Sequence, residues 1–140
     1  MTEQEAAIEA AKAAISYSPD WDYAHYVLAL VHYWFDGDFL SLQSLSEALR
    51  LLPTNADYYE LLASIHYEMG HYQTSLDTAR WGLEHEPEHV GCLYRAGVAL
   101  FDMNKRSDAK ILFKEVLRLE PEHASAQGFI GYFDTEAGRY

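Results

Sequence analysis

Apolar and polar positions follow the helical period along this chain, and the clearest example is the stretch Ala56–His89. It has the pattern of two short amphipathic helices joined by a turn. The same pattern occurs before and after this stretch, so the rest of the chain consists of copies or half copies of it. The hydrophobic pattern therefore predicts an all-α chain built from repeated helical hairpins.

The prolines give the length of the repeat. All four, Pro19, Pro53, Pro87 and Pro121, stand 34 residues apart, and a fixed period of this size is typical of stacked helical hairpins. In this register a residue pair that ends in a small side chain aligns in the first helices: Leu28-Ala29, Leu62-Ala63, Ala96-Gly97 and Ile130-Gly131. Small residues also align in the second helices: Ala7, Ser41, Ser75 and Ala109. Small residues let two helices approach closely, and each proline ends a second helix.

The period, the small residues and the prolines together resemble the tetratricopeptide repeat, and the resemblance covers the whole chain. The family pattern places an aromatic residue, leucine-glycine, tyrosine, alanine, phenylalanine and proline at set offsets within about 34 residues. This chain departs from it at His32 and His66, where tyrosine is usual, and at Asp134. The resemblance implies a right-handed solenoid of about eight antiparallel helices, in which each hairpin is stable only because its neighbours cover its apolar face.

The repeat register divides a single domain, residues 1–140, into five parts. They are the second helix of a partial repeat at 1–21, whole repeats at 22–55, 56–89 and 90–123, and the first helix of a further or capping repeat at 124–140. Thr2 followed by Glu5 is a capping-box pattern, so the first helix is expected to run to about Ser16. Other helices are expected at about 22–35, 39–52 and 124–137, with hairpin turns at Gly37, Gly70 and Asn104.

Composition restricts the partners. The formal net charge of −12 argues against nucleic acid, because phosphate binding needs clustered Lys and Arg, and it leaves apolar or basic partners. Cys92 is the only cysteine, so it is expected to be a packing residue, and the lack of an internal disulfide is compatible with the cytoplasm. The longest apolar run, Tyr26–Phe35, is far shorter than the ~20 residues that a membrane helix needs, so membrane insertion is not expected. No signal-peptide pattern is visible at the N-terminus.

In stacked hairpins of this type the first helices line the concave side, and their residues not used for packing recur at spacings of three and four. The predicted groove residues are Tyr23, Tyr26, Leu30, Tyr33, Trp34, Asp57, Glu60, Ser64, Tyr67, Glu68, Tyr94, Val98, Phe101 and Asp102, with Gly91, Tyr132 and Glu136 beside them. Aromatic rings offer large contact areas, and carboxylates select Lys or Arg. The hypothesis is a non-catalytic scaffold that binds an extended or helical peptide, apolar with some positive charge.

Other roles for these surfaces stay open. Several tyrosines could serve only to pack neighbouring repeats, with their hydroxyls in water. The chain could instead be a structural module that assembles with itself through its ends, Ala7–Ile15 and Phe129–Phe133. Some co-chaperones with this repeat hold a C-terminal carboxylate with two lysines, two asparagines and an arginine. The matching positions here are Tyr26, Leu30, Leu61, Gly91 and Arg95; only Arg95 fits, so this mode is not expected.

Three further motifs are interpreted as structural. His85–His89 has the letters of the zinc-protease motif, but Pro87 breaks the single helix that this chemistry requires. A basic stripe recurs every four residues and is expected on a solvated outer face: Arg106, Lys110, Lys114 and Arg118. His32 and His66 are expected to fill core positions. No phosphate-binding loop or catalytic constellation is present, so no metal, cofactor or enzymatic activity is expected.

Overall fold

The computed structural model describes residues 1–138, and over these residues the chain forms eight α-helices and no strand. The helices are α1 (Glu3–Tyr17), α2 (Asp22–Phe35), α3 (Asp38–Leu51), α4 (Ala56–Glu68), α5 (Tyr72–His85), α6 (Val90–Asp102), α7 (Arg106–Leu119) and α8 (Ala124–Ala137). The predicted all-α class is confirmed, and α2 and α8 have the predicted bounds. α3 begins one residue before the predicted Phe39, because Asp38 places its negative charge at the positive N-terminus of the helix.

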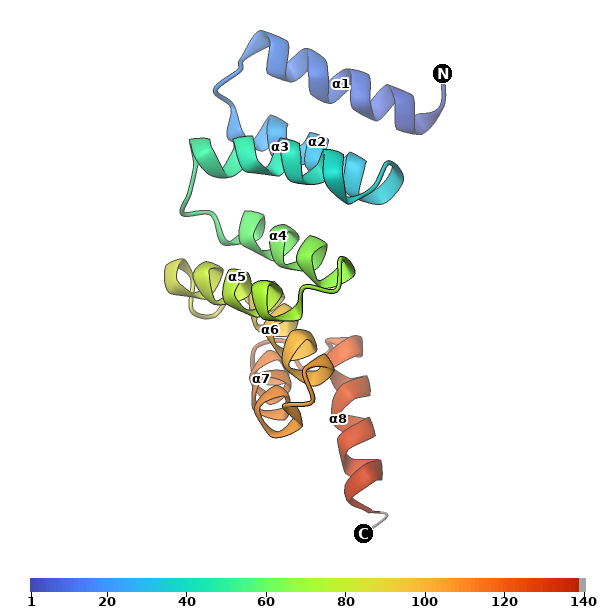
Figure 1. The fold of residues 1–140 in the computed structure, drawn as a ribbon, viewed down its shortest axis with the longest axis vertical. Coiled ribbons are helices and arrows are strands. Elements are labelled where there is room, and N and C mark those ends of the chain that lie inside the picture. The colour runs from blue at the N-terminus through green and yellow to red at the C-terminus, as the bar shows by residue number, and fades with distance from the viewer. Residues whose placement is uncertain (139–140) are drawn as a thin grey trace.

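The helices are stacked along the long axis of the molecule, and α1 and α8 lie at opposite ends of the stack (Figure 1). α2 packs mainly on α3, α4 on α5 and α6 on α7, which are the three predicted hairpins. Neighbouring hairpins also pack together, closely between α5 and α6 and less extensively between α3 and α4. α1 to α5 lie across the long axis whereas α8 runs along it, so the helix direction turns along the stack (Figure 1).

Each turn inside a hairpin contains one residue with a positive φ. The φ angle is 99° at Gly37, 81° at Gly70 and 63° at Asn104. Glycine adopts this conformation without a steric penalty, and asparagine tolerates it better than most residues do. The three predicted turn positions are therefore correct.

Side chains cap the first helices at the junctions between hairpins. Asn55, His89 and His123 each accept a hydrogen bond from a backbone N–H in the first turn of the following helix. These three residues also recur every 34 positions, like the prolines. At the start of the chain, Thr2 and Glu5 form the predicted capping box.

Two clusters of buried apolar residues form the core, and α4 contributes to both. The smaller cluster joins α2, α3 and α4 through Ala29, Leu45, Ala48, Tyr58, Leu61 and Ile65. The larger cluster spans α4 to α8 through Ala63, Leu76, Ala79, Leu93, Ala96, Val98, Ala99, Leu100, Ala109, Phe113, Val116, Ala126 and Phe133. Because each hairpin buries its apolar residues against the next one, the stability of each depends on its neighbours.

Buried serines tie the two helices together in the first two hairpins, α2–α3 and α4–α5. The Ser41 hydroxyl donates to the Ala29 carbonyl oxygen at 2.8 Å, and the Ser75 hydroxyl donates to the Ala63 carbonyl oxygen at 2.7 Å. All four are small residues that the repeat register aligned in the sequence. The close approach that they permit brings hydroxyl and carbonyl together, so neither buried polar group is left unsatisfied.

Some expectations about single residues are wrong. His32 and His66 are half-buried rather than in the core, and His32 Nδ1 lies 2.8 Å from the Asp36 carboxylate, which draws the ring to the end of α2. Phe133, expected at an uncovered end, is only 7% exposed because it packs against the rings of α6 and α7. Cys92 is fully buried, as expected of a packing residue, and burial raises the pKa of its thiol to about 12.

Candidate functional site

A hollow of about 180 Å³ lies between α2, α4 and α6 and is called the Glu60 hollow below. Its lining is Tyr26, Leu30, Tyr33, Trp34, Glu60, Leu61, Ser64 and Arg95. All of these except Leu61 and Arg95 were predicted to belong to the groove. Stacking of three successive first helices therefore brings together predicted groove residues that lie one repeat apart in the sequence.

Aromatic rings form the wall of the Glu60 hollow on the α2 side. Tyr33 and Trp34 meet edge to face with ring centroids 5.5 Å apart, and Trp34 is 73% exposed. Tyr26 packs on Tyr58 at 4.8 Å and lies 6.0 Å from Tyr23. Burial, with a smaller effect of nearby carboxylates, raises the pKa of Tyr26 to about 12. This wall offers exposed aromatic area on a rigid helix.

Glu60 supplies the negative charge of the hollow. Its carboxylate lies against Gly91 in the first turn of α6, where an added Cβ would come within 2.1 Å of Glu60 Oε1. Gly91 therefore leaves the space that the carboxylate occupies. Burial raises the pKa of Glu60, although His89 and Arg95 partly oppose this effect.

Asp57, another predicted groove residue, links α4 to the junction before α6. His89 Nε2 lies 2.6 Å from Asp57 Oδ1, and His89 Nδ1 accepts the backbone N–H of Cys92 at 3.0 Å. Since Nδ1 acts as an acceptor, the ring proton is on Nε2, where it is donated to Asp57. This pair therefore joins the start of α4 to the start of α6.

Asp57, Glu60 and His89 also bring three potential metal-ligand atoms within 4.8 Å of one another. A metal on His89 Nε2 would displace the proton that Asp57 accepts. A ring that then carried its proton on Nδ1 would lose the helix cap to Cys92. The bond between His89 and Asp57 and the cap that His89 provides for Cys92 account for this cluster without a metal, and we assign it a structural role.

The zinc-protease letters at 85–89 do not lie on one helix. His85 is the last residue of α5, whereas His89 precedes the first residue of α6 as its N-cap. The metal chemistry requires both histidines one turn apart on a continuous helix. The helix break predicted at Pro87 therefore separates the two histidines, and we do not interpret this motif as a zinc site.

Tyrosine–carboxylate pairs connect successive first helices. The Tyr33 hydroxyl donates to Glu68 at 2.6 Å, and one repeat later the Tyr67 hydroxyl donates to Asp102. The pKa of Tyr33 is raised to about 12, first by burial and then by the bond to Glu68. That of Tyr67 is raised to about 12, first by the bond to Asp102. These four predicted groove residues therefore also pack neighbouring repeats together.

A second hollow of about 440 Å³ lies between α6 and α8 and is called the Phe101 hollow below. Its lining is Tyr94, Phe101, Ser125, Gly128, Phe129 and Tyr132. The Phe101 ring centroid lies 5.1 Å from that of Phe129 and 5.6 Å from that of Tyr132. The Arg95 guanidinium carbon, in the Glu60 hollow, lies 5.4 Å from the ring centroid of Tyr94, in the Phe101 hollow. The two hollows therefore adjoin each other.

Val98 was predicted to line the groove, and this assignment is wrong. Its side chain belongs to the larger core cluster and is only 6% exposed. α6 has seven buried residues where α2 has three, so more of its surface is covered. Tyr23, at the other end of the groove, is exposed and adjoins Trp21, an exposed aromatic residue that the sequence prediction missed.

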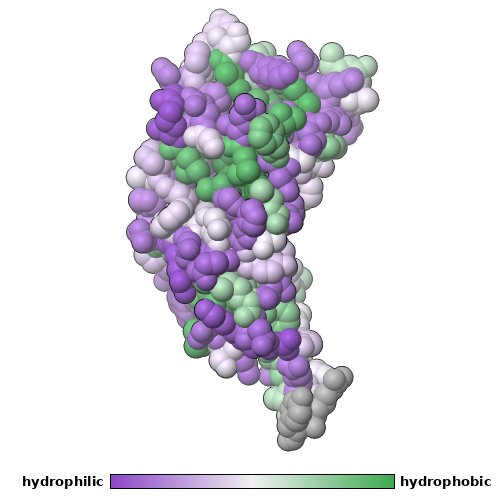
Figure 2. Space-filling model, in the orientation of Figure 1, coloured by the Kyte–Doolittle hydropathy of each residue, from purple (hydrophilic) through white to green (hydrophobic). Residues whose placement is uncertain are grey.

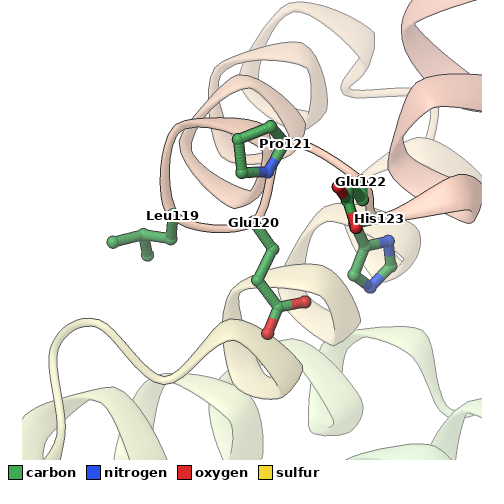
Figure 3. A pocket seen from close by; sticks show the side chains of 5 residues that line it. All are labelled: Leu119, Glu120, Pro121, Glu122 and His123. Atoms are coloured by element: carbon green, nitrogen blue, oxygen red, sulfur yellow. The ribbon is translucent and has the colours of Figure 1, made fainter.

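A third hollow of about 390 Å³ lies beside the junction of α7 and α8. It is lined by Leu119, Glu120, Pro121, Glu122 and His123. Figure 3 shows that these side chains spread apart rather than converge. His123 Nδ1 already accepts the backbone N–H of Ala126, so the ring serves as a helix cap. We therefore attribute this hollow to the shape of the turn.

The basic stripe on α7 is largely engaged with neighbouring acids. Arg118 forms ion pairs with Glu88 and Glu115, and Arg106 pairs with Glu136 on α8.

Elsewhere on the surface, Figure 2 shows hydrophobic residues gathered over the α3 region, with hydrophilic residues around them. None of the helices within residues 1–138 has the length and apolar character needed to cross a membrane.

Comparison with known proteins agrees with the repeat geometry. The family model of the tetratricopeptide repeat matches residues 90–123. Small glutamine-rich tetratricopeptide repeat-containing protein 2 of Saccharomyces cerevisiae is 29% identical over 86 residues, 61% of this chain and 25% of that protein. The chain spans about a quarter of the length of the curated relatives it matches.

Solved structures share the fold. MamA superimposes with a TM-score of 0.82 at 18% identity, covering 97% of this chain and 80% of that one. The first tetratricopeptide domain of Spaghetti (RPAP3), solved with the HSP90 peptide SRMEEVD, has a TM-score of 0.79 at 14% identity and covers 84% and 95%.

A stack of helical hairpins with a hollowed face of first helices defines the chain as a helical-repeat solenoid. The period of 34 residues, the family match and the likeness to solved repeat domains then specify the family. The chain is a tetratricopeptide repeat protein. Its fold is in general that of a protein-interaction scaffold.

Proposed function

We propose that the chain is a non-catalytic scaffold that binds a peptide or protein segment along the Glu60 and Phe101 hollows. The observation that supports this most is the Glu60 hollow, which three successive first helices build from aromatic rings and one carboxylate. A concave, mainly apolar surface with a few directed polar groups is typical of binding sites. The side chains stand on packed helices, so little conformational entropy is lost when a partner binds.

Charge favours a segment that is apolar with some basic residues. Four predicted groove carboxylates belong to α4 and α6: Asp57, Glu60, Glu68 and Asp102. Arg95 is the one basic residue that lines either hollow. The formal net charge of −12 adds a long-range attraction for a basic partner. A single buried cysteine suits the cytoplasm, where we place the chain.

A structural relative supports peptide binding by this architecture. The Spaghetti (RPAP3) domain was solved with a bound peptide, and its likeness to this chain concerns the fold alone. That peptide is acidic, whereas the groove carboxylates here favour the opposite charge. The proposed ligand therefore follows from the residues of this chain and not from the relative.

Selection from a phage library of random 12-residue peptides would test the proposal. Peptides selected on the wild-type chain should bind it saturably in a fluorescence titration. The double variant Tyr26→Ala, Tyr33→Ala should bind them at least about tenfold more weakly, the effect of losing roughly 1.4 kcal/mol or more of contact energy. Tyr17→Ala is the matched control, because Tyr17 is exposed on α1 and lines neither hollow. Equal affinity of the double variant and wild type would contradict the proposal.

The alternative function is self-assembly through the ends of the stack. Phe129 and Ile130 on α8 are half-buried, but Phe133 is covered and Phe129 stacks on Phe113 at 4.3 Å. Little of the expected apolar surface at this end is thus available to a second copy. Sedimentation velocity at increasing concentration separates the two functions, since a strict monomer removes the alternative.

A further inference from the structure

Glu60 has unused capacity to accept hydrogen bonds. Among residues 1–138 no side chain donates a hydrogen bond to its carboxylate, and none forms an ion pair with it. The carboxylate is half-buried, beside Gly91 and at the edge of the Glu60 hollow. A carboxylate in this setting has lost part of its hydration, so a charged donor from a partner would interact with it more strongly than in open water.

The walls of the hollow suit a flat cation with an apolar stem. The rings of Tyr26, Tyr33 and Trp34 line it, and Leu30 and Leu61 supply aliphatic surface. Its volume of about 180 Å³ equals that of roughly six water molecules at about 30 Å³ each, which suits one long side chain but not a helix. A guanidinium stacks on aromatic faces and binds a carboxylate through two parallel hydrogen bonds.

We propose that the Glu60 hollow is a pocket for one arginine side chain of the partner, whose guanidinium pairs with Glu60 while its stem lies against Tyr26, Tyr33 and Trp34. This inference rests on the proposed function of the groove and adds a specific anchor to it. The neighbouring carboxylates Asp57 and Glu68 are hydrogen-bonded within the chain, to His89 and Tyr33. Glu60 is therefore the carboxylate of the hollow that is open to a new partner.

Arg95 provides a test of whether the hollow prefers a cation or an anion. It lines the same hollow, yet no nitrogen of Arg95 lies within 4.0 Å of a carboxylate oxygen among residues 1–138. Its positive charge partly offsets the negative charge of Glu60 and repels an incoming cation. Removing this charge should therefore strengthen the binding of an arginine and weaken the binding of an acidic side chain.

The experiment is an NMR titration of the ¹⁵N-labelled full chain with the hexapeptide acetyl-Leu-Ala-Arg-Ala-Leu-Ala-amide. Two matched probes carry citrulline, which is neutral and of nearly the same shape, or glutamate in place of arginine. The variants are Glu60→Gln, Arg95→Gln and the control Glu84→Gln, whose side chain is exposed on α5 and lines neither hollow. Circular dichroism and thermal melts establish that all three variants keep the fold.

We expect the arginine probe to shift the amide signals of Glu60, Ser64 and Gly91 and to bind about tenfold more tightly than the citrulline probe, as for a charge-assisted pair. Glu60→Gln should remove this difference, Arg95→Gln should enlarge it, and Glu84→Gln should leave it unchanged. Equal binding of the arginine and citrulline probes, preference for the glutamate probe or absence of saturable binding would overturn the inference.

The two proposals fail in different ways. If library peptides depend on Tyr26 and Tyr33 while the arginine probe shows no preference over citrulline, the groove binds peptides but Glu60 is not an arginine anchor. If the library peptides are also insensitive to the tyrosine substitutions, the proposed function itself falls.

Discussion

Phe113 is the residue whose loss should most destabilise the part of the stack around α6–α8. It is fully buried on α7, stacks on Phe129 with ring centroids 4.3 Å apart and lies 2.9 Å from the position that a Cβ on Gly97 would take. Phe113→Ala should lower the free energy of unfolding by about 3–5 kcal/mol, the range for a buried phenylalanine. The lost ring stacking, worth about 0.5–1.5 kcal/mol, places the value toward the upper end.

Urea denaturation followed by circular dichroism measures this change. With a dependence of about 2 kcal/mol per molar urea, the midpoint should fall by roughly 2 M. Trp81 lies on α5 within the α4–α8 part of the stack and Trp34 on α2 within the other. Fluorescence of single-tryptophan variants therefore shows whether the α4–α8 part unfolds before the other part, as expected when neighbours stabilise one another.

Ile111→Ala is the matched control, because Ile111 lies on the same helix and is 65% exposed. It should change the free energy of unfolding by no more than about 0.5 kcal/mol. If Ile111→Ala is as damaging as Phe113→Ala, or if Phe113→Ala costs less than about 1 kcal/mol, too little for a buried ring, the assignment of Phe113 to the centre of the core is wrong.

Three further outcomes are expected. In a double-mutant cycle of Tyr33→Phe and Glu68→Gln, urea midpoints should give a coupling of about 0.5–1.5 kcal/mol, and zero coupling would mean that the pair does not link α2 to α4. Gly82→Ala should lower the free energy of unfolding in thermal melts, because the added Cβ would lie 2.6 Å from Cys92 Sγ. Gly128→Ala, whose added Cβ meets nothing within 4 Å, should raise this free energy by about 0.5–1 kcal/mol. The reverse order would refute the packing around Gly82. The Cys92 thiol, whose pKa is raised to about 12, should resist iodoacetamide at pH 8.5 until urea unfolds the chain, and rapid labelling of the native chain would contradict this burial. The thiol of the unfolded chain ionises near about 8.5, so the free energy of unfolding should fall as the pH rises from there toward 12.

The sequence by itself determined the repeat, the hairpin turns and most helix bounds. These features depend on short-range chemistry that recurs every 34 residues: prolines after second helices, a glycine or asparagine at each turn, and small residues where two helices meet. The register of one repeat therefore predicts the next. The aromatic and acidic character of the first helices could be predicted in the same way.

Only the tertiary structure decided how each groove residue is used. Val98 occupies a groove position by register but is buried, because α6 is packed on several sides at once. Asp57 is engaged by His89 and Glu68 by Tyr33, whereas Glu60 keeps a carboxylate open to a partner beside Gly91. These differences depend on distances between side chains of successive repeats, and those distances are set by how the helices stack rather than by a periodic pattern along the chain.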